Sequence, residues 1–307
     1  MSTVPGWTDP LLIFAMDHRD SYRTLLGLDG SDPAAETARA RAVKRVVLDG
    51  FLDALGELDD PRGATVLLDE EYGGPLVADA RAAGALVCLP LERSGQGELQ
   101  WEYGETLDAT AAVVDRLAPD LVKVLLRYNP EGDADLNARQ ADRLGEMSDW
   151  CLDRGLPLIV EVLMPPTPAQ RAASGPDLQR WDAEMRPGLM VDAVHRLRAA
   201  GADPAVWKIE GLDSTADAAA VVAAARADGR PDVSCIVLGR GADLDRVEQW
   251  LAVGAATPGY VGFAVGRSLW NAPALAHARG ELDEHGVRAA VAENYLRLCR
   301  AWRAGSA

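Results

Sequence analysis

Lys208 lies in the middle of the apolar run VWKIEGLD (206–213), whose pattern is typical of a buried strand. Burying a lysine ammonium costs free energy unless another group compensates its charge. Two similar runs also carry a charge, Lys123 in DLVKVLLRY and Glu161 in PLIVEVLM. Any one of these residues could belong to an ion pair in the core, as Lys208 could with Glu210. Three of them on successive strands predict a catalytic site.

Two lysines beside a carboxylate suit Schiff-base chemistry. A lysine attacks a carbonyl only as the neutral amine, a state that burial and a neighbouring cation both favour. We therefore expect Lys208 to be the nucleophile and Lys123 to be the neighbouring cation. Glu161 would transfer protons while the carbinolamine forms and loses water. Asp17 would act as a base or hold the lysine and a substrate hydroxyl.

Eight short apolar runs alternate with alanine-rich segments of helical period, which indicates right-handed βαβ units and a parallel sheet. Eight units in a chain of 307 residues predict a (β/α)8 barrel, with residues 1–307 forming a single domain. A long loop at about 165–190 is expected over the barrel mouth. The predicted strands are 11–17, 64–69, 85–90, 120–128, 157–164, 205–210, 233–239 and 259–265.

Polar residues stand where several of these strands end. In such a barrel the chemistry takes place at the carboxyl ends of the strands, and alternate strand residues point inward. Asp17 and Arg19 follow the first strand, and Asp69 follows the second. Arg127 and Glu210 lie at the ends of the fourth and sixth strands. We expect Asp17 to be catalytic and the other four to bind the substrate.

Two glycine-flanked arginines follow the last two strands. The turns LGRGAD and VGRSLW each precede a helical segment, so backbone amides and a helix N-terminus can form an anion pocket. Phosphate sites in these barrels often use the loops after strands seven and eight. A single Gly-Arg-Gly turn could simply be a tight connection, but two adjacent ones favour phosphate binding. The predicted phosphate-binding residues are Gly239, Arg240, Gly241, Gly266 and Arg267.

The composition excludes several classes of function. A net charge of −16 argues against a nucleic-acid partner, although a few arginines in a cleft can still bind a small anion. No apolar run is long enough to span a membrane, and no signal peptide is evident, so a cytoplasmic protein is expected. The four cysteines lack a CxxC spacing and are predicted to be reduced. With only four histidines, no metal site and no cofactor are predicted.

The chain resembles the class I aldolases of the (β/α)8 fold. In that group the Schiff-base lysine lies on strand six, a glutamate on strand five, a lysine on an earlier strand and an aspartate on strand one. Lys208, Glu161, Lys123 and Asp17 match those positions, and a Gly-Arg pair ending in Arg267 follows strand eight. The chain is most similar to the aldolase domain often fused to 5-dehydro-2-deoxygluconokinase in bacterial inositol catabolism. The motifs that carry this resemblance are FAMDHRDSY, LLDEEYG, VKVLLRYNPEGDADLNARQ, VWKIEGLD, CIVLGRGAD and VGFAVGRSLW.

The resemblance implies cleavage of 2-deoxy-5-keto-gluconate 6-phosphate to dihydroxyacetone phosphate and malonate semialdehyde. Lys208 would form the iminium, Glu161 would transfer protons, and Arg267 with the turn at 239–241 would hold the phosphate. The substrate's other end is a carboxylate, which requires a cation. The chemistry of the strand ends suggests Arg19 and Arg127 for it, with Arg93 as a third candidate.

Other functions remain open at this point. The substrate could be tagatose or fructose bisphosphate or sulfofructose phosphate, or the barrel could bind a sugar phosphate without catalysis. A magnesium-dependent lyase is a further alternative, although two lysines would repel the ion. The sequence is also compatible with a homo-oligomer. The carboxylates available to such a metal are Asp17, Asp69, Glu70 and Glu161.

Overall fold

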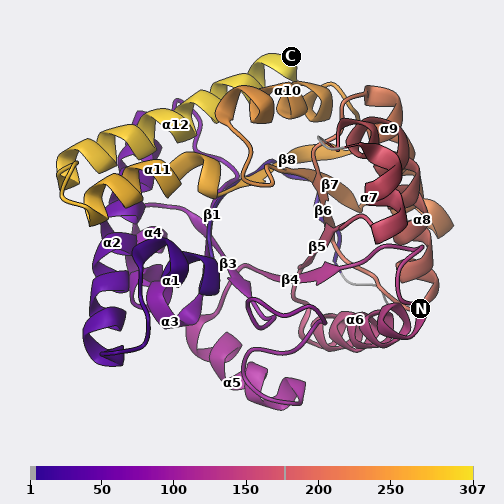
Figure 1. Cartoon of the computed structure of the whole chain (residues 1–307), viewed down its shortest axis with the longest axis horizontal. Coiled ribbons are helices and arrows are strands. Elements are labelled where there is room, and N and C mark those ends of the chain that lie inside the picture. Colours follow the sequence, from indigo (N-terminus) through magenta and orange to yellow (C-terminus); the bar gives the residue numbers. More distant parts are fainter. Residues whose placement is uncertain (1–4, 176–177, 307) are drawn as a thin grey trace.

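The structure, a computed structural model, describes residues 5–175 and 178–306. Eight parallel strands close in chain order into one barrel, with the helices around it (Figure 1). The predicted (β/α)8 barrel is confirmed, and each predicted strand differs from the observed one by no more than one residue at either end. The strands are β1 (Leu11–Met16), β2 (Ala64–Leu68), β3 (Leu86–Pro90), β4 (Leu121–Arg127), β5 (Leu158–Leu163), β6 (Val206–Glu210), β7 (Ser234–Leu238) and β8 (Tyr260–Val265).

The helices fill the connections between the strands. Many begin at an Asp, Ser or Thr side chain that accepts a hydrogen bond from the first turn, as Asp133 does from the amide of Leu136. They are α1 (Asp20–Leu26), α2 (Pro33–Glu57), α3 (Glu70–Gly73), α4 (Val77–Ala82), α5 (Leu107–Leu117), α6 (Ala134–Arg154), α7 (Pro168–Ser174), α8 (Arg186–Ala199), α9 (Thr215–Ala225), α10 (Leu244–Ala255), α11 (Arg267–Ala278) and α12 (Glu284–Gly305), with the short segments η1 (Gly74–Leu76), η2 (Trp181–Met185) and η3 (Ala227–Gly229).

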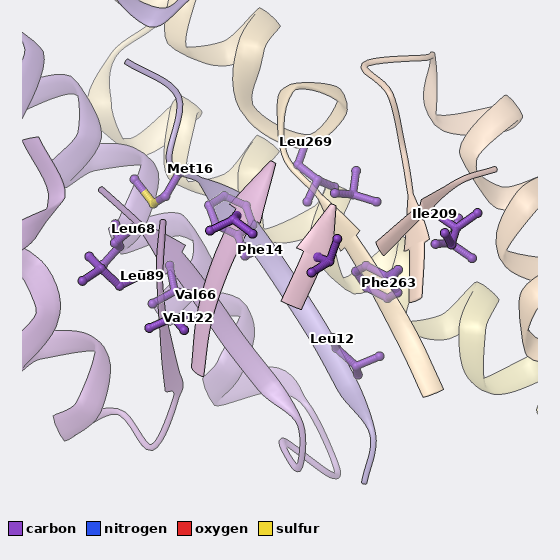
Figure 2. Close-up of a cluster of buried hydrophobic side chains, with 14 of the residues drawn as sticks. Leu12, Phe14, Met16, Val66, Leu68, Leu89, Val122, Ile209, Phe263 and Leu269 are labelled. Atoms are coloured by element: carbon purple, nitrogen blue, oxygen red, sulfur yellow. The ribbon is translucent and has the colours of Figure 1, made fainter. Parts of the chain in front are cut away.

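Two apolar layers follow from the alternation of side chains along each strand. On β1, Phe14 and Met16 face the surrounding helices, and Figure 2 shows them within this outer layer. Ile13 and Ala15 belong instead to the separate cluster that fills the barrel. By the same alternation, Asp17 is directed to the inside at the mouth.

The same rule places the charged strand residues inside the barrel. On β6, Trp207 and Ile209 belong to the outer layer, whereas Val206 belongs to the inner cluster. Lys208 therefore faces inward, as predicted. In the register of the sheet it lies directly opposite Glu161 of β5.

The connection between β5 and β6 contains more structure than the single loop expected at about 165–190. It forms α7, the π-helical segment η2 and the start of α8. The segment η2 contacts both α7 and α8. Residues 176 and 177 of the expected loop lie outside the described residues, and the described part of this connection is largely helical.

The described residues include no helix that combines the length and apolar character needed to cross a membrane. All four cysteines are free and buried, as predicted.

Candidate active site

A cavity of about 290 Å³ lies at the carboxyl ends of the strands. Most of the predicted site residues, which come from distant parts of the chain, line it together. The loop 93–99, which follows β3, forms another part of the wall. The predicted residues that line the cavity are Asp17, Arg19, Lys123, Arg127, Glu161, Lys208, Gly239, Arg240, Gly241, Gly266 and Arg267.

Lys208 and Lys123 share one carboxylate. The Lys208 Nζ donates to Glu161 Oε2 at 2.8 Å, and Lys123 Nζ lies 3.2 Å from the same oxygen. Both lysine side chains are almost fully buried, at 4% and 2% exposed. The two lysine Nζ atoms therefore flank Glu161, which is in position to exchange a proton with Lys208.

Lys123 is held by three carboxylates. Its Nζ lies 2.8 Å from Asp17 Oδ2 and 2.6 Å from Glu92 Oε1, in addition to the contact with Glu161. A lysine ammonium has three N–H donors, so these partners can use all of them. Lys123 is thus fixed as a cation, whereas the described contacts of Lys208 include only one carboxylate.

Burial and charge act in opposite directions on the carboxylates. Burial raises the pKa of Asp17 and of Glu161, but nearby lysines, chiefly Lys123, outweigh it and hold both pKa values below their usual range. For Lys123 burial acts in the other direction and lowers the pKa. The three neighbouring carboxylates outweigh burial and raise the pKa of Lys123 well above its usual value. For Glu92 burial wins over Lys123 and Arg19, so its pKa is raised. Glu92 is therefore the most basic of the three carboxylates.

The two glycine-flanked turns, which follow β7 and β8, meet in the wall of the cavity. Gly241 has a φ of 74°, and a Cβ there would lie 3.1 Å from Nη2 of Arg267, so glycine leaves space for that guanidinium. Arg267 lines the cavity at the start of α11. Within residues 5–175 and 178–306, no carboxylate lies within ion-pair distance of it. A helix N-terminus and an uncompensated arginine together suit an anion.

Arg240 has a different environment from Arg267. Its two terminal nitrogens each donate to a carboxylate oxygen of Asp182 in η2, at 2.7 Å. Its backbone is left-handed, with a φ of 52°, and Glu210 Oε1 lies 3.6 Å from Nη1. Arg240 thus connects the β7 turn to the β5–β6 connection, and its charge is already compensated.

The arginines near β1, β3 and β4 also differ. Arg19 is buried, pairs with Glu102 at 2.6 Å and donates to the Glu92 carbonyl at 2.7 Å. Arg127 donates to the Gln96 carbonyl at 2.6 Å, and no described carboxylate pairs with it or with Arg93. Both line the cavity. The cations available to an anion on this side are therefore Arg127 and Arg93.

Two predicted binding residues, Asp69 and Glu210, do not line the cavity. Asp69 is fully buried, forms an ion pair with Lys44 of α2 and accepts from the amide of Tyr72 at 2.7 Å. Glu210 accepts from the amide of Met164 at 3.0 Å. Both carboxylates hold the barrel's connections in place, so direct substrate binding by either would require rearrangement.

The four carboxylates of the magnesium alternative do not all meet at one point. Asp17 and Glu161 contact Lys123, Asp69 faces Lys44, and Glu70 pairs with Arg116 at 2.6 Å. Across the described part of the chain, no group of three or more His, Cys, Asp or Glu side chains is arranged to hold a metal ion. These carboxylates therefore do not form a magnesium site.

Sequence reasoning missed Glu92 and His18, which both line the cavity. Each follows a strand end, and that position was the available signal: Glu92 comes two residues after β3, and His18 two residues after β1. The buried Lys44 was also missed, because its charge lies on a helix.

Solved structures with a similar fold include two aldolases. A fructose-bisphosphate aldolase from Plasmodium falciparum, solved in complex with TRAP and a small-molecule inhibitor, is 14% identical with a TM-score of 0.67, covering 96% of this chain and 91% of that one. A Schiff-base-forming fructose-1,6-bisphosphate aldolase is 16% identical with a TM-score of 0.53, covering 95% and 93%. At such identities the similarity shows the fold alone.

No curated protein matches the sequence. The model of a bacterial family, described as "Uncharacterized protein conserved in bacteria (DUF2090)", matches residues 2–306. Since that match spans nearly all of the 307 residues, the chain belongs to the DUF2090 family.

Proposed function

We propose that the protein is a class I aldolase that cleaves 2-deoxy-5-keto-gluconate 6-phosphate to dihydroxyacetone phosphate and malonate semialdehyde. The observation that carries this proposal is the buried Lys208, whose Nζ lies 2.8 Å from Glu161 in the wall of the cavity. The sequence resemblance to the aldolase domain of inositol catabolism supports the same reaction. The fold shared with Schiff-base-forming aldolases is compatible with it.

The first step is formation of an imine on Lys208. Its amine must release a proton to attack the C5 ketone, and Glu161 Oε2 is in position to accept it. Losing the Lys208 charge removes one of the cations that hold the pKa of Glu161 down, which makes Glu161 a better base at that moment. Glu161 then returns the proton to the carbinolamine oxygen, which leaves as water.

The second step breaks the bond between C3 and C4. The C3 hydroxyl gives its proton to a carboxylate and becomes the aldehyde of malonate semialdehyde, while the electrons of the broken bond move to the iminium nitrogen and leave an enamine. Glu92 suits this role because burial raises its pKa. Asp17, whose pKa is low, instead holds Lys123. Protonation of the enamine and hydrolysis then release dihydroxyacetone phosphate.

Arg267 would bind the phosphate, together with the turn at 239–241. We expect Arg267→Ala to raise KM about 10- to 100-fold with little change in kcat, since a charge-assisted contact to the phosphate is lost. Steady-state kinetics measures this. The control is Arg62→Ala, because Arg62 is 81% exposed and lies outside the cavity. An unchanged KM in the Arg267 variant would contradict the phosphate assignment.

Arg127 and Arg93, which both line the cavity, would bind the carboxylate at the other end of the substrate. Arg19 is less suited, because Glu102 already compensates its charge. We expect Arg127→Gln to raise KM about tenfold more for a substrate with this carboxylate than for a ketose phosphate without it. Equal effects on both substrates would show that Arg127 does not read the carboxylate.

The proposal is tested by measuring dihydroxyacetone phosphate release from a panel of substrates in EDTA. The panel contains 2-deoxy-5-keto-gluconate 6-phosphate, tagatose and fructose bisphosphates and sulfofructose phosphate. We expect the highest kcat/KM for the first, undiminished by EDTA. A higher value for another member would replace the substrate and keep the reaction. Binding without any turnover would favour the non-catalytic sugar-phosphate barrel.

A further inference from the structure

His18 is a cavity residue to which the proposed reaction assigns no task. It follows β1, which pairs with β8, so it lies beside the turn that carries Gly266 and Arg267. Its ring packs edge-on against Trp270, with centroids 5.3 Å apart. A Cβ on Gly266 would come within 2.9 Å of His18 Cε1, so glycine at 266 makes room for the imidazole. The ring is thus placed by packing against the turn of the predicted phosphate site.

Packing holds the ring, and no hydrogen bond to a described residue fixes it. Its Nδ1 is buried and has no hydrogen-bond partner among the described residues. The closest carboxylate, Oδ1 of Asp17, lies 3.7 Å away, and the other oxygen of Asp17 accepts from Lys123. A buried polar atom without a partner costs about 1–3 kcal/mol, a cost more often tolerated where a group has a function. The ring's position beside Arg267 indicates an anionic ligand.

We propose that His18 completes an anion site with Arg267 and the turn at 239–241, and that its imidazole donates a hydrogen bond to the substrate's phosphate. This inference rests on the proposed function, because it names a further ligand for the phosphate of that same substrate. It predicts that recognition of the phosphate includes a titratable group.

The charges around His18 determine its protonation. Burial, then Arg267 of α11, Lys208 of β6 and Lys44 of α2 lower its pKa to about 4, against the opposing effect of Asp17. The ring is therefore neutral near pH 7 while the site is empty. A bound dianion offsets the Arg267 charge and places negative charge beside the ring, so it raises the pKa and favours uptake of a proton. Because binding and protonation are linked, anion affinity then rises as the pH falls, by up to about tenfold per pH unit.

Sulfate is the appropriate probe, since it remains a dianion over this pH range and cannot react with Lys208. We expect sulfate to bind at least about threefold more tightly at pH 6.0 than at pH 7.5, measured by calorimetry. The ring ¹⁵N shifts of His18 should change from the neutral to the protonated pattern on sulfate addition. With only four histidines in the chain, glutamine variants of His195, His277 and His285 assign the signals.

Two variants separate the hydrogen bond from the charge. His18→Gln retains an N–H donor but has no titratable ring. It should therefore bind sulfate, but its affinity should not rise at low pH. His18→Phe should bind more weakly at both pH values. If neither variant folds, the ¹⁵N measurement on the wild-type protein decides alone.

A neutral His18 with sulfate bound near pH 6, or wild-type pH dependence in His18→Gln, contradicts the proposal, as does absence of sulfate binding. The measurement is independent of turnover. If no Schiff base forms on Lys208, the aldolase assignment is overturned. The sulfate-binding result for His18 would still stand.

Discussion

Replacing Lys208 by methionine is expected to reduce carbon–carbon cleavage about a thousandfold or more, because no other side chain is placed to form the imine. Lys123 cannot substitute, since its Nζ is bound by Asp17, Glu92 and Glu161. Release of dihydroxyacetone phosphate, followed under single-turnover conditions, measures the loss. Circular dichroism and thermal unfolding establish that the variant is folded.

Lys208→Arg is the matched control for charge. It restores a cation beside Glu161 and thereby preserves the ion pair that is 2.8 Å long in the wild type. A guanidinium does not form an imine with the ketone, so this variant should be as inactive as Lys208→Met. Substantial cleavage by the arginine variant would show that Lys208 is only an ion-paired residue of the barrel core.

Lys123→Met is expected to have the largest effect on stability. The substitution leaves the carboxylates of Asp17, Glu92 and Glu161 facing one another without their common cation. Removing one partner from a buried ion pair typically costs about 3–5 kcal/mol. Urea unfolding at pH 7.5 measures the change in the free energy of unfolding. A loss below about 1 kcal/mol would contradict the role assigned to Lys123.

The pH dependence of this loss follows from the direction of the pKa shifts. In the wild type, the pKa values of Asp17 and Glu161 are lower in the folded state than in the unfolded state. Their stabilisation is present above about pH 4 and is lost as the pH falls further. In Lys123→Met the carboxylates repel one another and their pKa values rise, so protonation relieves the destabilisation. The difference in stability between the two proteins should therefore narrow from pH 7.5 to pH 5. A constant difference would show that lost packing, and not charge, is the cause.

The sequence was sufficient for the barrel and for the residues at its centre. Side chains alternate between the two faces of a strand. Once VWKIE is identified as a strand, Lys208 must therefore share a face with Val206, and Trp207 must point to the other face. The same rule turns Lys123 and Glu161 inward. The strands appear in the sequence as compact apolar runs, and their boundaries followed from these runs.

The partners of the charged residues at the mouth could not be predicted in this way. The charge of Arg19 is compensated by Glu102. The segment after β3 folds back through an antiparallel backbone bridge between Glu92 and Trp101, and this places Glu102 next to Arg19. Arg240 is compensated by Asp182, which is 58 residues away in the sequence. Such contacts depend on the conformation of irregular connections, which hydrophobic periodicity does not specify.

Glu210 is a residue on a strand whose partners also could not be predicted from the sequence. Its position two residues after Lys208 suggested that both side chains serve the cavity. The structure instead directs its carboxylate to the amide of Met164 and towards Arg240. At the last residue of a strand, the neighbouring connections decide where a side chain points.

The central claim is that Lys208 forms a Schiff base. It is tested most directly by incubating the protein with dihydroxyacetone phosphate, reducing with borohydride and mapping the modified peptide by mass spectrometry. We expect a single adduct on Lys208, present in EDTA and absent from Lys208→Met. Cleavage activity without an adduct on any lysine, or an adduct on another lysine that survives in Lys208→Met, would contradict the claim.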